Sequence, residues 1–147
     1  MRTRAAIFLL AVSACVAPED PASSEGQDTS TELPCRIARV VDGDTVDLTC
    51  PAGRVRARLV GYDTPETHEP RCSAELALGR AATTHLRRVI SRSQDIDIQL
   101  LGVDRYGRAL TRLKIDGTNV AQNMIQEGLA VPYSGGRRIN WCARLNA

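Results

Sequence analysis

The order of the chain's short alternating segments constrains its fold more than any other feature. Residues 37–41 and 46–50 are rich in β-forming side chains, and an Asp-Gly-Asp turn at residues 42–44 joins them, with a glycine that can take a positive φ. This pattern predicts a hairpin. Residues 54–59 then alternate arginine with apolar residues, so a strand here would direct three arginines to one face and the apolar residues to the other.

A long helical segment follows these three strands. Residues 72–90 contain no proline and repeat apolar residues at helical spacing, which predicts a helix. Residues 95–101 and 108–115 alternate again and predict two more strands, joined by the polar loop 102–107. The helix therefore falls between the third and the fourth strand.

A short second helix is expected over residues 119–127, where Val120 and Met124 would be buried and Gly128 would end the helix. The order strand-strand-strand-helix-strand-strand is that of a five-stranded OB-fold barrel, an architecture often used to bind oligonucleotides and oligosaccharides. We therefore expect an α+β, mainly β domain over residues 33–147, with a helix between strands three and four and a short C-terminal helix. Fold alone does not establish function.

The composition is that of one ordinary globular domain. The chain has 147 residues, of which 43% are hydrophobic and 24% charged, and no stretch reaches the roughly 18–20 consecutive apolar residues of a membrane-spanning helix. Transporters, coiled coils and solenoids are excluded. Residues 33–147 carry 17 basic and 12 acidic side chains, and 16 of the bases are arginine, whose planar fork matches a phosphate with two hydrogen bonds. A GC-rich genome also enriches arginine, so this excess favours a polyanionic ligand only weakly.

The N-terminal part has the composition of a targeting segment followed by a linker. Residues 1–14 combine two arginines with an apolar run, which predicts an export signal. Residues 12–15 resemble a bacterial lipobox, in which cleavage precedes a cysteine that is then acylated, and ordinary signal cleavage nearby is the alternative. Residues 15–32 predict a flexible acidic tether. We expect an exported protein anchored by a lipid on Cys15 in the cell envelope, facing the periplasm or the exterior, or else a secreted soluble protein.

The cysteines are consistent with an oxidising compartment. Five are present, and setting Cys15 aside leaves an even number without C-x-x-C spacing, which predicts two disulfides rather than a zinc site. Across the first hairpin, residues whose numbers sum to about 86 face each other, so Cys35 is expected close to Cys50. This leaves Cys72 and Cys142 for the second disulfide.

Three short segments concentrate carboxylates and arginines: Asp-Gly-Asp-Thr at 42–45, the stretch 58–66, and Asp-Arg-Tyr-Gly-Arg at 104–108. Read singly, each is better explained as a polar turn or loop. Together, in this order and spacing, they resemble the three active-site motifs of the staphylococcal nuclease (thermonuclease) family, and Glu-Gly-Leu-Ala at 127–130 resembles the end of its late helix. The resemblance covers roughly residues 36–133.

The resemblance implies a calcium site. Members of that family bind Ca²⁺ through the carboxylates that correspond to Asp44 and Asp63 and the backbone carbonyl that corresponds to Thr64. A hard cation takes about six to eight oxygen ligands, so waters and a substrate phosphate would complete the shell. The resemblance assigns Glu66 to positioning or deprotonating the attacking water, and Asp42 to a supporting place beside the metal ligands.

The resemblance also implies a phosphodiester substrate. Arg58 and Arg108 correspond to arginines that bind phosphate oxygens and stabilise the transition state. Arg105 and Tyr106 match positions that contact a terminal phosphate, and Tyr133 falls near a base-stacking tyrosine, with a place on the rim as the alternative. The expected reaction is Ca²⁺-dependent hydrolysis of DNA, RNA or both that leaves 3′-phosphates, carried out by a monomer.

Some features depart from the family pattern or admit another interpretation. The family's type member has a longer C-terminal helix, whereas here we expect Cys142 to hold the tail with Trp141 packed beside it. His68 and His85 lack metal-ligand spacing, and we expect a polar loop residue and a helix-surface residue. The competing hypotheses are a non-catalytic OB-fold module that binds nucleic acid and a structural envelope lipoprotein. Neither requires all the acidic and arginine positions of the motifs, and all of them are present.

Overall fold

The computed structural model describes residues 34–146. The expected export signal (1–14), lipidation site (Cys15) and tether (15–32) lie outside the described residues. Within the described part of the chain, no helix is both long enough and apolar enough to cross a membrane.

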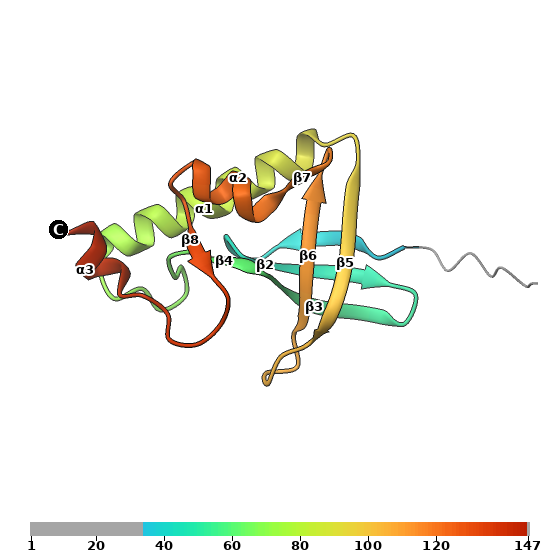
Figure 1. Cartoon of the computed structure of the whole chain (residues 1–147), viewed down its shortest axis with the longest axis horizontal. Helices are drawn as coiled ribbons and strands as arrows, with labels where there is room; N and C mark the ends of the chain where they lie inside the picture. Colours follow the sequence, from blue (N-terminus) through green and yellow to red (C-terminus); the bar gives the residue numbers. More distant parts are fainter. Residues whose placement is uncertain (1–33, 147) are drawn as a thin grey trace, which may run out of the picture. The chain divides into compact units, whose positions relative to one another are not determined.

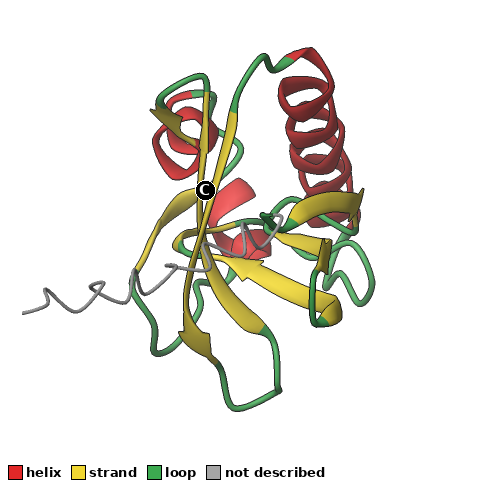
Figure 2. Ribbon diagram, turned by 90° about the vertical axis from the view of Figure 1, so that its right-hand side faces the viewer, coloured by secondary structure: helices red, strands yellow, loops and turns green. Residues whose placement is uncertain are grey.

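Six strands form the main sheet, and five of them correspond to the five alternating segments of the sequence. In chain order these five are β1 (Arg36–Val40), β2 (Thr45–Cys50), β3 (Gly53–Leu59), β5 (Ile96–Val103) and β6 (Ala109–Ile115). They pair in the order β1-β2-β3-β6-β5, and every pair is antiparallel except β3 with β6. In Figure 2, two long strands of this sheet rise between the helices, and other strands lie below them. The expectation of a mainly β, OB-fold type of architecture is confirmed.

Three further strands were not predicted, because two or three residues are too few to show an alternating pattern. β7 (Thr118–Asn119) pairs with β6 at the edge of the main sheet. β4 (Gly61–Asp63) and β8 (Val131–Tyr133) form a separate antiparallel pair. This second pair matters for the site, because it brings the segment that follows β3 next to the C-terminal part of the chain.

Three helices accompany the sheet: α1 (Ser73–Arg92), α2 (Val120–Gln126) and α3 (Trp141–Leu145). α1 and α2 match the two predicted helices. The side chain of Asn119 caps α2 by accepting a hydrogen bond from the backbone N–H of Ala121, and Gly128, with a φ of 70°, follows its end. α3 was not predicted, and Figure 1 shows it beside the first turns of α1.

The apolar core lies between the main sheet and the helices α1 and α2. Val46 and Leu48 from β2, Leu86 from α1 and Met124 from α2 belong to one apolar cluster and are fully excluded from solvent. Val120 is buried as well, so both predicted core residues of α2 are confirmed. Burial of such side chains is the main contribution to the stability of a domain of this size.

His85 departs from the expectation of a helix-surface residue, because it is buried between the two helices. Its Nε2 lies 2.7 Å from Oδ1 of Asn123 in α2, and its Nδ1 lies 2.8 Å from Nη2 of Arg88. Helical periodicity placed His85 correctly on α1 but could not show that α2 covers that part of its surface. The ring therefore links α1 to α2.

The first hairpin and its disulfide are present. Val40 pairs with Val46, as the predicted register requires. Farther from the turn, a β-bulge between Ile37 and Arg39 shifts the pairing by one residue. Beyond the bulge, Cys35 and Cys50 form a disulfide with their Cα atoms 4.1 Å apart.

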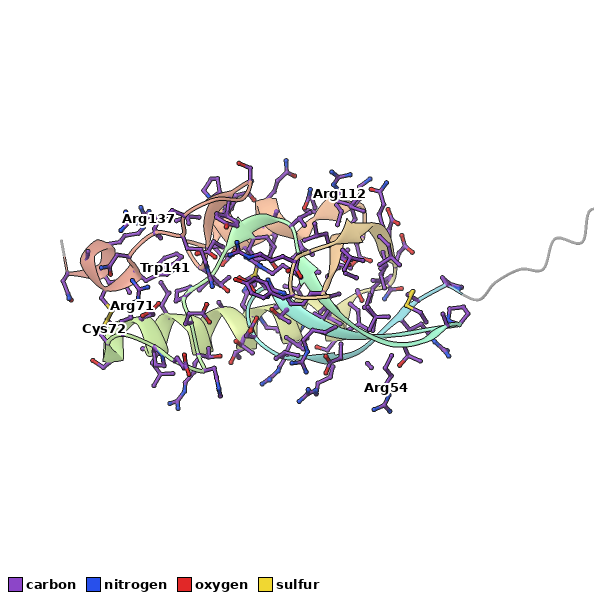
Figure 3. All side chains as sticks on the ribbon, turned by 90° about the horizontal axis from the view of Figure 1, so that it is seen from below. Arg54, Arg71, Cys72, Arg112, Arg137 and Trp141 are labelled. Carbon is purple, nitrogen blue, oxygen red and sulfur yellow. A yellow bond between two sulfur atoms is a disulfide. The ribbon has the colours of Figure 1, made fainter. Side chains whose placement is uncertain are left out.

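The second disulfide joins Cys72 and Cys142, which are 70 residues apart in the sequence and have Cα atoms 6.0 Å apart. It connects the residue before α1 to α3. Figure 3 shows Cys72 and Trp141 at the same end of the molecule, and Trp141 is only 3% exposed. The tail is therefore held in the way the sequence predicts, by this disulfide with the tryptophan packed beside it.

Candidate active site

Arg58 lies at the end of β3 and is buried, unlike the other arginines of that strand. Arg54 and Arg56 are exposed, whereas the side chain of Arg58 is only 9% exposed. Its guanidinium donates hydrogen bonds to the backbone carbonyls of Leu59 at 3.0 Å and Tyr62 at 3.1 Å. The chain turns back over Arg58 immediately after β3, so the alternation predicted its face correctly but not its burial.

Two buried carboxylates flank the guanidinium of Arg58. Oδ2 of Asp44 lies 2.8 Å from its Nη1, and Oδ1 of Asp63 lies 3.4 Å from its Nη2. The same Asp44 oxygen accepts hydrogen bonds from the backbone N–H of Thr64 at 3.2 Å and from its hydroxyl at 3.0 Å. The indole N–H of Trp141 donates to Oδ2 of Asp63 at 3.1 Å. Both carboxylates are therefore held in fixed orientations.

Gly43 allows the turn between β1 and β2 to approach Thr64 and α1. A Cβ at this position would lie 2.8 Å from Oγ1 of Thr64 and 2.9 Å from Cβ of Ala82. Gly43 is not among the glycines with positive φ, so the turn requires its small size and not the conformation expected from the sequence. Tyr62 donates from its hydroxyl to the carbonyl of Gly43 at 3.0 Å, and burial raises the pKa of this tyrosine well above its usual value, which keeps the donor proton in place.

Asp42 supports the turn that carries Asp44. Its Oδ1 accepts a hydrogen bond from the backbone N–H of Asp44 at 3.0 Å. Burial raises the pKa of Asp42 to about 6, and the negative charge of Asp44 adds to this effect. Asp42 therefore fixes the backbone at Asp44, and its role beside a bound cation stays a prediction.

Glu66 stands on a loop that a buried glutamate of α1 holds in place. Its side chain is 42% exposed. Glu75, in the first turn of α1, is 3% exposed and accepts hydrogen bonds from the backbone N–H groups of Arg71 at 2.7 Å and Glu66 at 3.5 Å. This role of Glu75 has no signal in the sequence, because an acidic residue in the first turn of a helix is common without one.

Arg138, in the loop between β8 and α3, places a second guanidinium over these groups. Its Nε donates to Oδ1 of Asp63, its Nη1 donates to Oε1 of Glu66, and its Nη2 donates to the carbonyl oxygen of Thr64 at 3.0 Å. Nη2 also lies 3.8 Å from Oδ2 of Asp44. Burial alone would lower the pKa of Arg138, but the charges of Asp63, Glu66 and Asp44 outweigh it and raise the pKa.

The loop between β5 and β6 presents a second group of predicted residues. Oδ1 of Asp104 accepts hydrogen bonds from the backbone N–H groups of Tyr106 at 2.8 Å and Arg108 at 3.0 Å, and its Oδ2 accepts from Nε of Arg108 at 2.8 Å. The guanidinium carbons of Arg105 and Arg108 lie 4.9 Å and 5.5 Å from the ring centre of Tyr106, which is 68% exposed. The loop therefore holds two cationic groups around one exposed aromatic ring.

Both groups of side chains line one hollow of about 1660 Å³. Its lining includes most of the predicted site residues together with Arg138: Asp44, Arg58, Glu66, Arg105, Tyr106, Arg108, Tyr133 and Arg138. Asp63 and Thr64 are buried just behind this wall. The hydroxyl of Tyr133 donates to the carbonyl of Gly136 at 2.8 Å. Among residues 34–146, no hydrogen bond or ion pair connects the β5–β6 loop to Asp44, Asp63 or Glu66. The two groups of side chains therefore face each other across the hollow without direct contact of this kind.

Two residues that sequence analysis did not assign to the site contact its carboxylates directly. No motif of the sequence points to Arg138, and Trp141 is expected only to pack beside Cys142. A signal was available, because Cys72 follows Glu66 by six residues and the predicted partner of Cys72 is Cys142. That pairing already places the residues before Cys142 near the loop of Glu66.

The donor atoms fit a hard divalent cation. Asp44 and Asp63 supply carboxylate oxygens, Thr64 supplies a carbonyl oxygen, and the carboxylate of Glu66 lies beside them. In this structure all four residues already face one positively charged group, the guanidinium of Arg138. Carboxylate and carbonyl oxygens are the ligands that Ca²⁺ prefers, and the exposed side would admit water.

Comparison with known proteins bears on this arrangement. The family described as "Staphylococcal nuclease homologue" matches residues 56–140, which is more than half of the chain. The match includes Arg58, Asp63, Glu66 and Arg108. Asp44 lies before its start.

Several relatives are also similar over most of this chain. "Endonuclease YhcR" of Bacillus subtilis (strain 168) is 34% identical over 121 residues, "Thermonuclease" of Staphylococcus hyicus is 27% identical over 126 residues, and an "Uncharacterized endonuclease" of Escherichia coli O157:H7 is 33% identical over 99 residues. These alignments cover 77%, 86% and 67% of this chain. They span 10%, 74% and 60% of the respective relatives. With the family match and the motifs together, the chain belongs to the staphylococcal nuclease family.

Proposed function

We propose that this protein is a nuclease that hydrolyses phosphodiester bonds of DNA, RNA or both with Ca²⁺ as its cofactor. The observation that carries the proposal is the convergence of Asp44, Asp63, the Thr64 carbonyl and Glu66 beside a hollow that also presents Arg108. The relatives named as a thermonuclease and endonucleases support the same class of reaction.

In the proposed reaction, Asp44, Asp63 and the carbonyl of Thr64 hold the cation. Bound Ca²⁺ would polarise a phosphoryl oxygen and favour ionisation of a nearby water. Glu66, whose side chain is partly exposed to the hollow, accepts the proton of the attacking water. The water oxygen bonds to phosphorus, the bond from phosphorus to the 5′ oxygen breaks, and that oxygen takes a proton from solvent. The remaining product carries a 3′-phosphate.

The arginines stabilise the charge that develops on the phosphoryl oxygens. Arg58 is fixed by its backbone and carboxylate contacts, and Arg108 is oriented by Asp104, so neither needs much reorganisation as the charge grows. Arg105 and Tyr106, which line the same hollow, would contact a terminal phosphate of the substrate. Because the hydroxyl of Tyr133 is engaged by a backbone carbonyl, its ring is the part offered to a substrate base.

The purified protein is expected to cleave DNA or RNA in the presence of Ca²⁺ and to lose all cleavage in a chelator. Asp63→Asn, purified in the same way, is the matched control: it removes one charged ligand while keeping an oxygen that can accept from Trp141. Product ends should block extension by a polymerase until a phosphatase removes the 3′-phosphate. Chelator-resistant cleavage would contradict the Ca²⁺ site, and binding without any cleavage would favour the non-catalytic module.

We further propose that the protein is exported and anchored through Cys15. The export-type segment 1–14, the lipobox-like residues 12–15 and the two disulfides support this. Protein made in a bacterial host is expected to sediment with membranes and to show a lipid-modified Cys15 at its N-terminus by mass spectrometry, whereas Cys15→Ser should not. An unmodified N-terminus at Cys15 or Pro18 would rule the anchor out.

A further inference from the structure

We propose that Arg138 is a built-in occupant of the cation position, whose guanidinium takes the place of Ca²⁺ in the metal-free protein and is displaced when the ion binds. This inference rests on the proposed function, because it concerns the same carboxylates. It adds that a residue of this chain competes with the cofactor and thereby sets the Ca²⁺ concentration at which the site fills.

Arg138 contacts the same oxygens that are assigned to the cation. Its Nε contacts Asp63 and its Nη2 donates to the carbonyl of Thr64 at 3.0 Å, with Oδ2 of Asp44 at 3.8 Å from the same nitrogen. Its Nη1 contacts Glu66, the proposed base. A guanidinium has five N–H donors and no acceptor, so it requires converging oxygens as a metal ion does. The two cations cannot share them.

The negative charge of the site also favours an exchange of Arg138 for a divalent cation. Asp44, Asp63 and Glu66 place three carboxylates within a small volume. Among the described residues, Arg58 forms ion pairs with Asp44 and Asp63, whereas Glu66 forms one with Arg138. Like charges held close together in a partly dehydrated site repel each other strongly. Arg138 offsets this repulsion when no ion is present. A divalent cation would offset it more fully, which favours exchange of the guanidinium for the ion.

The side chain of Arg138 can leave the carboxylates without unfolding the tail. Its side chain is 39% exposed, whereas that of Arg58 is 9% exposed and donates to several backbone carbonyls. The backbone on either side is anchored separately, by the Tyr133 hydroxyl on Gly136 and by the disulfide of Cys142. Rotation of the Arg138 side chain toward the hollow is therefore sufficient, while Arg58 has no comparable freedom.

The consequence is a measurable competition. If the guanidinium occupies the site in about nine molecules of ten, the apparent affinity for Ca²⁺ is reduced about tenfold. Removing the guanidinium should then tighten Ca²⁺ binding, although it also removes a positive charge from the wall that faces the substrate.

The test compares Arg138→Gln with Arg137→Gln by calorimetric titration of each protein with CaCl₂ alone. Arg137 lines the same hollow and is exposed, and among residues 34–146 it makes no hydrogen bond or ion pair, so Arg137→Gln controls for the loss of one positive charge from this loop. We expect Arg138→Gln to bind Ca²⁺ about tenfold more tightly than the unmodified protein, and clearly more tightly than Arg137→Gln. Equal or weaker binding by Arg138→Gln would overturn the proposal.

Thermal unfolding provides a second readout. In chelator, Arg138→Gln should melt at a lower temperature than Arg137→Gln, because three carboxylates lose a counter-charge. At saturating Ca²⁺ this difference should disappear. A difference that persists unchanged at saturation would mean that Arg138 is a structural ion-pair partner, which would overturn displacement.

A measurement on the unmodified protein covers the case in which Arg138→Gln does not fold. The Nε–H resonance of Arg138 should be protected from solvent exchange in chelator and lose its protection when CaCl₂ is added. Ca²⁺ binding with the resonance unchanged would overturn this proposal and leave the proposed nuclease intact. Absence of Ca²⁺ binding in every variant would refute both the calcium site and the competition, and an activity assay without Ca²⁺ would then show whether cleavage survives.

Discussion

Replacing Arg58 with lysine is expected to lower kcat by about 10²–10³-fold while changing KM little. The planar fork of Arg58 spans Asp44 at 2.8 Å and Asp63 at 3.4 Å, and a lysine ammonium cannot hold both carboxylates in this geometry. Because the arginine is proposed to act on charge that appears in the transition state, the loss should fall mainly on the chemical step.

The matched control is Arg56→Lys, on the same strand. Arg56 is exposed and pairs with Asp47 at 3.0 Å, away from the site, so its replacement should leave kcat and KM near those of the unmodified protein. Steady-state cleavage of a defined oligonucleotide at saturating Ca²⁺ measures both constants, and a melting curve for each variant verifies that it is folded. A loss confined to KM would show that Arg58 only binds the ground-state substrate.

Removing the disulfide between Cys72 and Cys142 is expected to destabilise the protein by about 4–5 kcal/mol, against about 3 kcal/mol for the hairpin disulfide between Cys35 and Cys50. In the chain-entropy model, a link that closes a longer loop restrains the unfolded chain more, and the sequence separations are 70 and 15 residues. The long disulfide also holds the tail that brings Trp141 to Asp63.

This comparison requires double serine variants, Cys72→Ser with Cys142→Ser and Cys35→Ser with Cys50→Ser, so that no free thiol is left to form a wrong disulfide. Denaturant unfolding of each gives the two losses of stability directly. At saturating Ca²⁺, the variant without the Cys72–Cys142 disulfide should also cleave more slowly per protein molecule, because Asp63 loses the support of Trp141. Equal losses of stability would contradict the loop-length argument, and a larger loss for the hairpin variant would reverse it.

Local patterns in the sequence predicted five of the eight strands, two of the three helices and both disulfides of the described residues. Alternation and helical periodicity report which face of a segment is apolar, and the apolar faces of β2, α1 and α2 do meet in one core around Leu48, Leu86 and Met124. The hairpin register placed Cys35 near Cys50, because pairing across a short turn depends on residues close in the chain. The remaining cysteines then had one possible pairing.

The composition of the candidate site was predicted less completely. The motifs identified Asp44, Asp63 and Arg58 as residue types suited to a cation and a phosphate, but their contacts depend on segments brought together by the fold. Arg138 approaches Asp63 across 75 positions of sequence, and no periodicity encodes such a contact. It follows from the Cys72–Cys142 disulfide and the β4–β8 pairing acting together.

Burial was the other property that local patterns could not supply. Arg58 alternates with apolar residues just as Arg54 and Arg56 do, yet it alone of the three is enclosed, because the chain turns back over the end of β3. His85 similarly lies on a polar stretch of α1 and is buried only because α2 packs against it. The sequence thus specified the elements and the chemistry available to the site through interactions between near neighbours. Packing between distant segments determines which charged side chains are buried and which cation pairs with the carboxylates. In that packing, desolvation and close charge pairs outweigh the local conformational preference of each segment.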